Sequence, residues 1–365
     1  MKVLAVNGGS SSIRYAVFDA GPPMARVHHG KIDEDPRGLT RAFVSWIQTQ
    51  GWFGALDAVG HRIVHGMQHT RPQRITSSLL ADLQRLLPYD PEHLPRELEL
   101  ILALQHLQPA LPQVACFDTA FHAGMPRTAQ LLPIPRRYFR QGVRRYGFHG
   151  LSYTYLSREL HRIGEPAVQN GRMVYAHLGS GASVAAILNG RSVDTSMAFT
   201  STAGLLTSSR SGDLDPGLVS YLARTEQMSA DRFQRMVTHE SGLLGVSETS
   251  ADMRVLLANE STDERAADAV EMFCVGARKW IAAMAASLGG MDVLVFTGGI
   301  GENAAPVRER ICEGLSFLGV CLDSGRNLRN EAIISTDPAD VRVRVVPTDE
   351  ESVLADDVIH ELRDE

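Results

Sequence analysis

The chain has 365 residues, a length that favours two domains because a single hydrophobic core rarely grows this large. Apolar residues make up 44% and charged residues 21%, as is typical of a globular protein. The net charge of −6 argues against a nucleic-acid binder or a protein of anionic membrane surfaces, although a bound nucleotide needs only local positive charge. The four cysteines are widely spaced, and no apolar run is long enough to span a bilayer. We therefore expect a reduced, cytoplasmic protein without a membrane segment.

The first predicted element is a hairpin over residues 3–19, in which a Gly/Ser turn at 8–12 separates two apolar runs. Short apolar runs then alternate with segments of helical periodicity, which indicates an α/β domain. The expected elements are a helix over 40–50, a strand over 58–64, helices over 78–87 and 97–107, and a strand over 114–117. Residues 126–150 are expected to form a basic, loop-rich segment.

The second half of the chain begins with a predicted hairpin over residues 174–190, with Gly and Ser at 179–181. Residues 192–215 are polar and show little periodicity, which is typical of a functional loop. A helix is expected over 263–288, with Gly289 as its C-terminal cap. The last expected elements are a strand over 293–296, a Gly-rich turn over 297–303 that leads into a helix, and a strand over 341–346.

The two hairpins carry the most informative signal, because each half of the chain contains one. Glycine lets the backbone come close to a ligand, and the exposed N–H groups and serine hydroxyls of such a turn suit phosphate. The paired turns therefore suggest that a phosphate chain is bound between two related domains. The Gly-rich turn over 297–303 adds a third place where a nucleotide can bind, although by itself it equally suits a tight connection.

Several single side chains are candidates for chemistry, and each also has a simpler interpretation. Arg62 at a strand end and Arg210 in the polar loop can bind a carboxylate or phosphoryl group at two points, or form surface ion pairs. Asp118 follows a strand, where reactive side chains of α/β folds lie, but it can equally be a helix cap. His149 and His177 can donate to phosphate oxygens or be core histidines.

Ten short motifs occur in a fixed order, and together they resemble the acetate kinase (acetate/propionate kinase) family over essentially the full chain. The motifs span residues 9–12, 60–66, 117–122, 144–150, 177–181, 211–217, 241–245, 252–254, 298–303 and 347–351. The resemblance implies two duplicated ribonuclease-H-like domains of the actin-like and sugar-kinase-like superfamily, with the active site in the cleft between them. The acyl-substrate domain would comprise residues 1–122 and 351–365, and the nucleotide and dimerisation domain residues 123–350.

The resemblance also implies a role for individual residues. Asn7 and Glu350 would hold Mg²⁺ or Mn²⁺. The catalytic residues would be Asp118, His149 and Arg210, and the acyl substrate would bind Arg62, Val64 and Phe148. The residues expected to bind ATP or ADP are Arg14, His177, Leu178, Gly179, Ser180, Gly181, Asp252, Met253, Arg254, Gly299, Ile300, Gly301, Glu302 and Asn303.

The function implied is a reversible, magnesium-dependent transfer of the ATP phosphoryl group to acetate, in line, by a homodimer that needs no nucleic-acid partner. A carboxylate is already ionised at pH 7, so the reaction needs no strong base. Propionate or another short-chain carboxylate is an alternative acceptor. A non-catalytic, actin-like nucleotide-binding protein is a second alternative, against which the presence of Arg62, Asp118 and Arg210 argues.

The sequence departs from the family pattern at several positions. Arg14 stands in place of a phosphate-binding lysine. The run Leu-Pro-Tyr-Asp-Pro at 87–91 replaces Pro-Leu-His-Asn-Pro, and Ser201 stands where an acyl-pocket proline is expected. The nucleotide and metal motifs are largely intact. The departures therefore predict an active kinase with an altered acyl preference.

Overall fold

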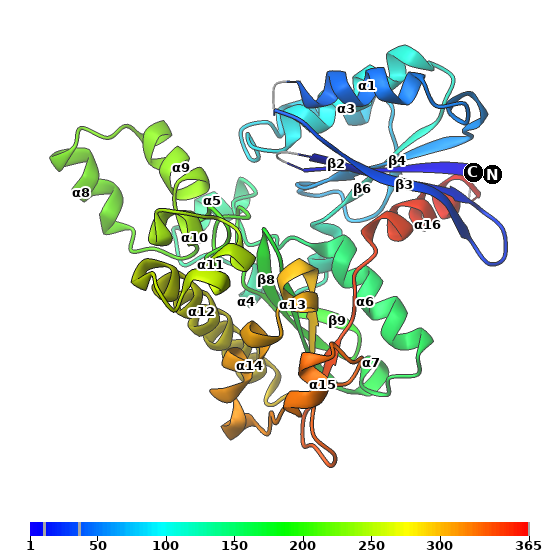
Figure 1. Ribbon diagram of the computed structural model, residues 1–365. Coiled ribbons are helices and arrows are strands. Elements are labelled where there is room, and N and C mark those ends of the chain that lie inside the picture. The colour runs from blue at the N-terminus through cyan, green and yellow to red at the C-terminus, as the bar shows by residue number, and fades with distance from the viewer. Residues whose placement is uncertain (10–11, 36–37, 364–365) are drawn as a thin grey trace. The chain divides into compact units, whose positions relative to one another are not determined.

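The computed structural model describes residues 1–9, 12–35 and 38–363 and is shown in Figure 1. The chain divides into two compact units. Unit 1 comprises residues 1–123, 148–155 and 349–365, and unit 2 comprises residues 124–147 and 156–348. Ser10 and Ser11 of the first predicted turn lie outside the described residues. No helix in the described part of the chain is long and apolar enough to cross a membrane.

Unit 1 is built on a six-stranded sheet with the strand order β3-β2-β1-β4-β6-β5. β1 is antiparallel to β2 and parallel to β4, β2 is antiparallel to β3, and β6 is parallel to β4. The strands are β1 (Lys2–Gly8), β2 (Ser12–Asp19), β3 (Ala25–Asp33), β4 (Ala58–Ile63), β5 (Gln73–Arg74) and β6 (Gln113–Phe117). The helices are α1 (Leu39–Gln48), α2 (Ser77–Arg85), α3 (Leu94–Leu107) and α16 (Glu350–Arg363), with α6 (Gly150–Arg162) beginning in this unit.

Helices cover both faces of this sheet. Successive side chains of a strand point to opposite faces, so β1 contributes to two separate cores. Leu4 and Val6 pack with residues of α1 and α3, whereas Val3 and Ala5 pack with residues of α16. Figure 1 shows α1 and α3 on one side of the strands and α16 on the other. The C-terminal helix is therefore part of the N-terminal unit.

Unit 2 repeats the same topology. Its sheet has the order β11-β10-β7-β8-β9, in which β7, β8 and β9 are successively antiparallel and β10 and β11 are parallel to β7. The strands are β7 (Arg172–Leu178), β8 (Ala182–Leu188), β9 (Arg191–Thr195), β10 (Val293–Thr297) and β11 (Arg342–Val345). The order and directions match those of β1, β2, β3, β4 and β6. This match confirms the predicted α/β fold with a duplicated unit.

The helices of unit 2 include one long helix and many short ones. They are α4 (Arg127–Gln130), α5 (Arg136–Arg140), α7 (Ala167–Asn170), α8 (Gly217–Thr225), α9 (Ala230–His239), α10 (Gly242–Ser247), α11 (Met253–Asn259), α12 (Glu264–Leu288), α13 (Gly298–Asn303), α14 (Ala305–Glu313) and α15 (Ser324–Leu328). The predicted helix over 263–288 is confirmed as α12, with Asp263 as its N-cap and Gly289 as its C-cap. Both predicted hairpins are confirmed as β1–β2 and β7–β8.

The structure also differs from the expected elements at several places. β3 was not predicted, because this edge strand is mostly exposed and has no apolar alternation. β9 occupies the first residues of the polar stretch expected to be a loop. α3 begins at Leu94, three residues before the expected start, with Pro95 in its first turn. The segment 126–150 contains the short helices α4 and α5, and the Gly-rich turn is itself the helix α13.

We predict that Leu354→Ala in α16 lowers the free energy of unfolding by about 2–5 kcal/mol, because it leaves a cavity between the helix and the sheet. Leu354 is fully buried in the core that α16 shares with β1. Chemical denaturation followed by circular dichroism measures the change. Arg363→Ala, at an exposed position of the same helix, is the control and is expected to change stability by less than about 0.5 kcal/mol. Equal stability of both variants would contradict the docking of α16.

Candidate functional site

Three of the predicted site residues of unit 1 lie at one edge of its sheet. Asn7 is on β1, Arg62 is on β4 and Asp118 directly follows β6. These strands are parallel, so their carboxyl ends meet at the same edge. The sequence places the three residues far apart, and the sheet brings them together.

Arg62 and Asp118 form a largely buried ion pair. Arg62 Nε donates to Asp118 Oδ2 at 2.8 Å, and Arg62 Nη2 lies 2.7 Å from the same oxygen. Asp118 Oδ1 accepts from the backbone N–H of Leu151 at 3.2 Å. Burial alone would lower the pKa of Arg62, but the charges of Asp118, Glu350 and Glu97 and the hydrogen bond to Asp118 together outweigh burial and raise it. The guanidinium is therefore charged and held in one orientation.

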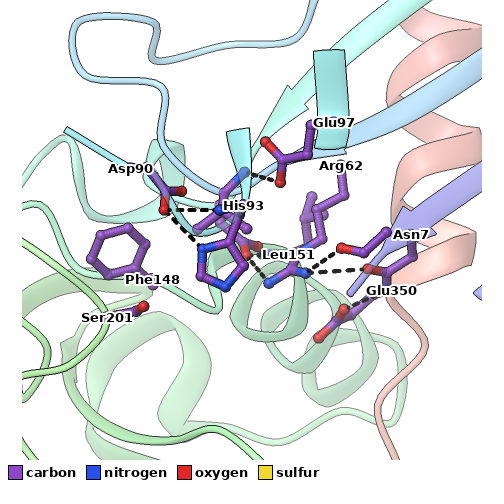
Figure 2. Close-up of polar contacts among 12 residues, drawn as sticks. Asn7, Arg62, Asp90, His93, Glu97, Phe148, Leu151, Ser201 and Glu350 are labelled. Carbon is purple, nitrogen blue, oxygen red and sulfur yellow. Dashed lines mark hydrogen bonds and ion pairs between the residues drawn. The ribbon is translucent and has the colours of Figure 1, made fainter. Parts of the chain in front are cut away.

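Asn7 connects this pair to the start of α16. Its side-chain amide donates to Glu350 Oε2 at 2.8 Å and to Glu351 Oε1 at 3.2 Å, and its Oδ1 accepts from Arg62 at 3.4 Å. Figure 2 shows Arg62, Asn7 and Glu350 joined in this order. Burial, together with the charges of Asp118 and Glu351, raises the pKa of Glu350 to about 7. Carboxylates outnumber cations at this edge of the unit 1 sheet, so the binding of an added cation is favoured there.

The remaining predicted residues of unit 1 lie around the same edge. Arg14 is exposed on β2, directly opposite Asn7 in the hairpin register, so both side chains are on one face of the sheet. Val64 and Phe148 are buried, with 2% of each exposed. The backbone N–H of Val64 donates to Glu97 Oε1 at 3.0 Å. The carbonyl oxygen of Phe148 hydrogen-bonds to a ring nitrogen of His122 at 3.1 Å.

His149 lies on a backbone segment that passes very close to Asp118. Its φ of 60° is in the left-handed region, which is uncommon for a residue with a side chain and marks a constrained segment. A Cβ added to the next residue, Gly150, would lie 2.0 Å from the carbonyl oxygen of Asp118. Glycine at 150 therefore permits the approach that places the N–H of Leu151 on the Asp118 carboxylate.

Two of the three predicted nucleotide-binding segments of unit 2, 177–181 and 299–303, meet at one sheet edge. His177 and Leu178 end β7, and the turn 179–181 follows them. β10 is parallel to β7 with Thr297 next to His177, so α13 begins beside that turn. Gly298 has a φ of 77°, and a Cβ there would lie 2.7 Å from the carbonyl oxygen of Leu178. This close backbone approach brings the two Gly-rich segments together.

Arg210 belongs to a turn that reaches the same hairpin. The backbone N–H of Ser208 donates to the carbonyl oxygen of Ser180 at 3.3 Å. Within the turn, the N–H of Thr207 donates to the carbonyl oxygen of Arg210 at 3.0 Å, and the N–H of Arg210 donates to the Thr207 hydroxyl at 3.3 Å. The fold of unit 2 thus gathers the turn 179–181, α13 and the Arg210 turn.

Glu302 makes hydrogen bonds within unit 2. Its Oε1 accepts from the backbone N–H groups of Gly298 at 2.9 Å and Thr348 at 3.1 Å. This carboxylate therefore satisfies the first N–H group of α13, which has no partner within the helix, and links the start of α13 to Thr348.

Arg308 is a residue that sequence reasoning missed. It is fully buried, donates to the carbonyl oxygens of Gly301 and Glu302 at 2.9 and 3.0 Å, and donates to the side chain of Asn327 at 2.8 Å. Burial lowers the pKa of this guanidinium to about 10. Arg308 holds the C-terminal end of α13 from inside the unit. The sequence did carry a signal for this residue, because Arg308 is a charged residue at an apolar position of a helix.

The segment 252–254 starts α11. Asp252 caps this helix by accepting from the N–H of Arg254 at 2.9 Å, and the two side chains form an exposed ion pair with a 2.6 Å contact. Met253 is 3% exposed and packs in the core of unit 2. Of the three residues, Asp252 and Arg254 present side chains that a ligand can reach.

Comparison with known proteins gives consistent matches over nearly the full chain. The model of the acetokinase family matches residues 47–356. An acetate kinase of Rhodopseudomonas palustris is 41% identical over 97% of this chain and 96% of its own length, and a propionate kinase of Citrobacter rodentium is 38% identical over 98% and 96%. The solved acetate kinase of Porphyromonas gingivalis has a TM-score of 0.86 at 34% identity over 99% of each chain. The solved propionate kinase of Francisella tularensis has a TM-score of 0.88 at 30% identity over 98% of each chain.

We predict that Gly150→Ala costs on the order of 3 kcal/mol of unfolding free energy, because the added methyl group overlaps the backbone of Asp118. Gly124→Ala is the matched control, since a Cβ there meets nothing within 4 Å. Denaturant titration of both variants measures the difference. A Gly150→Ala protein as stable as the control would show that the segment at 148–151 does not lie against Asp118.

Proposed function

The chain belongs to the acetokinase family, and we propose that it is an ATP-dependent kinase that phosphorylates the carboxylate of acetate, reversibly, to acetyl phosphate. It is a phosphotransferase with a carboxyl group as acceptor. Propionate is the alternative acceptor, since relatives of similar identity include propionate kinases. The observation that carries the proposal is the oriented Arg62 guanidinium at the edge of the unit 1 sheet, a group suited to a carboxylate. Because the co-substrate is ATP, we place the reaction in the cytoplasm.

The proposed reaction moves one phosphoryl group and no proton. A carboxylate oxygen of the acid attacks the γ-phosphorus of ATP, the bond to the β–γ bridging oxygen breaks, and ADP leaves. The barrier arises from bringing two anions together, so positive charge is the main requirement. We propose that Arg62 binds the carboxylate and that Arg210 and His149 stabilise the transferring phosphoryl group. Asp118 orients Arg62 and removes no proton, a role supported by its bonds to that guanidinium.

We propose that Mg²⁺ binds at Asn7 and Glu350. The donors would be the Glu350 carboxylate and the Asn7 amide oxygen, which here accepts from Arg62. Mg²⁺ prefers such oxygen donors, and the few protein ligands leave positions for water and phosphate oxygens. The fit is supported by Glu350, whose pKa is raised by burial and by the charges of Asp118 and Glu351, so that a bound cation would stabilise its ionised form. When bound, the ion would neutralise charge on the phosphates. Arg14, opposite Asn7, would add a second cation for the phosphates.

We propose that ATP binds unit 2 through the turn 177–181, the start of α13 and the segment 252–254. Backbone N–H groups at a Gly-rich turn and at a helix N-terminus suit phosphate. Support comes from the contact of the first two segments at one sheet edge and from the exposed Asp252 and Arg254. The acyl-side residues lie in unit 1, so the proposed reaction requires both units.

The activity itself is tested by incubating the protein with acetate and MgATP and trapping acetyl phosphate with hydroxylamine. We expect hydroxamate and ADP to form in equal amounts, and neither product to form without acetate. A non-catalytic nucleotide-binding protein would bind ATP and give no hydroxamate. That result with every short-chain acid tested would overturn the proposed function.

We predict that Arg62→Ala lowers kcat/KM for the acid by about 10²–10³-fold, because the carboxylate loses its charged partner. Arg41→Ala, at an exposed position of α1, is the matched control and is expected to retain wild-type kinetics. Steady-state measurement of ADP release at varied acid concentration gives kcat and KM for both variants. Wild-type kinetics for Arg62→Ala would show that Arg62 does not bind the acid.

We also propose a homodimer formed through unit 2. The helix α8 has no buried residue, and Leu218, Val219 and Tyr221 are 37%, 45% and 55% exposed. We expect Tyr221→Glu to shift the protein toward the monomer in light scattering, whereas Phe317→Glu, at a position that is 75% exposed, leaves the mass unchanged. A wild-type mass of a single chain would contradict the dimer.

A further inference from the structure

Two carboxyl groups are buried near Arg62, and each has one oxygen without a hydrogen-bond partner. Asp90 and Glu97 are 8% and 4% exposed. Asp90 Oδ1 accepts from the backbone N–H of His93 at 3.3 Å and hydrogen-bonds to its Nδ1 at 2.8 Å, and Glu97 Oε1 accepts from Val64. Asp90 Oδ2 and Glu97 Oε2 have no partner among the described residues. Leaving a buried polar atom unpaired costs about 1–3 kcal/mol, so these two oxygens call for a ligand.

The two carboxyl groups differ in charge. Burial opposes the ionisation of Asp90, but the hydrogen bond and charge of His93 outweigh it and hold its pKa below the ordinary value. Burial and the charge of Asp90 raise the pKa of Glu97 well above its ordinary value. Asp90 Oδ2 is therefore an acceptor. The raised pKa favours the protonated form of Glu97, whose proton would lie on Oε2 because Oε1 accepts from the backbone N–H of Val64. The unpaired atoms are one acceptor and one donor.

Both groups lie beside the residues proposed to bind the acyl substrate. The carboxyl group of Glu97 accepts a hydrogen bond from the backbone N–H of Val64. Asp90 interacts electrostatically with His65, whose ring lies 5.5 Å from that of Phe148. In the view of Figure 2, the Asp90–His93 pair is drawn between Phe148 and Arg62.

We propose that the acid phosphorylated by this protein carries a hydroxyl group on its short carbon chain, and that Asp90 and Glu97 bind this hydroxyl. The inference rests on the proposed function and names the acceptor of that reaction more closely. A hydroxyl both donates and accepts, so it complements an ionised and a protonated carboxyl group. A methyl group satisfies neither, and a second carboxylate is repelled by Asp90. Asp90 itself lies in the run at 87–91, where the sequence departs from the family pattern.

The test compares acids of equal size with and without the hydroxyl. Glycolate and propionate have the same number of non-hydrogen atoms, as do lactate and isobutyrate. Each acid is assayed with MgATP, and kcat and KM are obtained from ADP release. We expect kcat/KM to be about tenfold or more higher for the hydroxy acid of each pair, because only that acid satisfies the buried oxygens.

Two variants test whether Glu97 causes the expected preference for hydroxy acids. Glu97→Leu removes the donor and adds an apolar side chain, so we expect the glycolate-to-propionate ratio of kcat/KM to fall about tenfold, mainly through the KM for glycolate. Glu99→Leu is the matched control on the same helix, since Glu99 is exposed. A merely structural role for Glu97 would lower the values for both acids equally. Such an equal loss in Glu97→Leu would overturn the assignment of Glu97.

The wild-type comparison alone decides the inference if the variants do not fold. Turnover of propionate that equals or exceeds that of glycolate would overturn it, leave the proposed function in place and assign the buried oxygens to water. Absence of ADP release with all of the acids would instead overturn the proposed function itself. Selective turnover of glycolate and lactate would support both the inference and the proposed function.

Discussion

The ion pair between Arg62 and Asp118 is the constraint on which the site of unit 1 depends. A guanidinium at a largely buried position needs a counter-charge, and a buried aspartate needs donors for both of its oxygens. Asp118 meets both requirements, with one oxygen on Arg62 and the other on the backbone of Leu151. The pair therefore ties together β4, β6 and the start of α6, and it orients the guanidinium before any substrate arrives.

The duplicated topology suits the two different ways of binding anions that we propose. Unit 1 would bind an anion through side chains at the ends of its parallel strands, and unit 2 through backbone turns at the corresponding edge, where the segment at 179–181 meets α13. A carboxylate suits a planar cation, whereas phosphate oxygens suit several backbone N–H groups. The same strand order can serve both because parallel strands bring their carboxyl ends to one edge.

Buried carboxyl groups near Arg62 underlie the acyl preference that we propose for this chain. Asp90 and Glu97 are buried where a purely hydrocarbon acyl chain would leave two polar atoms unsatisfied. Burial and the charge of Asp90 raise the pKa of Glu97. The consequence is a matched acceptor and donor, a pattern that selects by hydrogen bonding as well as by size.

Sequence patterns were enough to predict most of the local elements and the family. Both hairpins, α12 with its caps and the residues at strand ends follow from periodicity and turn chemistry, which act between near neighbours. Edge strands such as β3 were not predicted. Backbone pairing holds them in the sheet, and their exposed side chains show no apolar alternation.

The partners of the site residues could be found only from the packing of distant segments. Arg62 and Asp118 are 56 residues apart, and Asn7 and Glu350 are 343 apart, so no local pattern pairs them. Burial of Arg308 behind α13 and of Glu97 beside Val64 likewise depends on packing between distant segments. The physical reason is that hydrogen bonding and desolvation depend on which groups surround an atom in space, and the order of residues does not specify those surroundings.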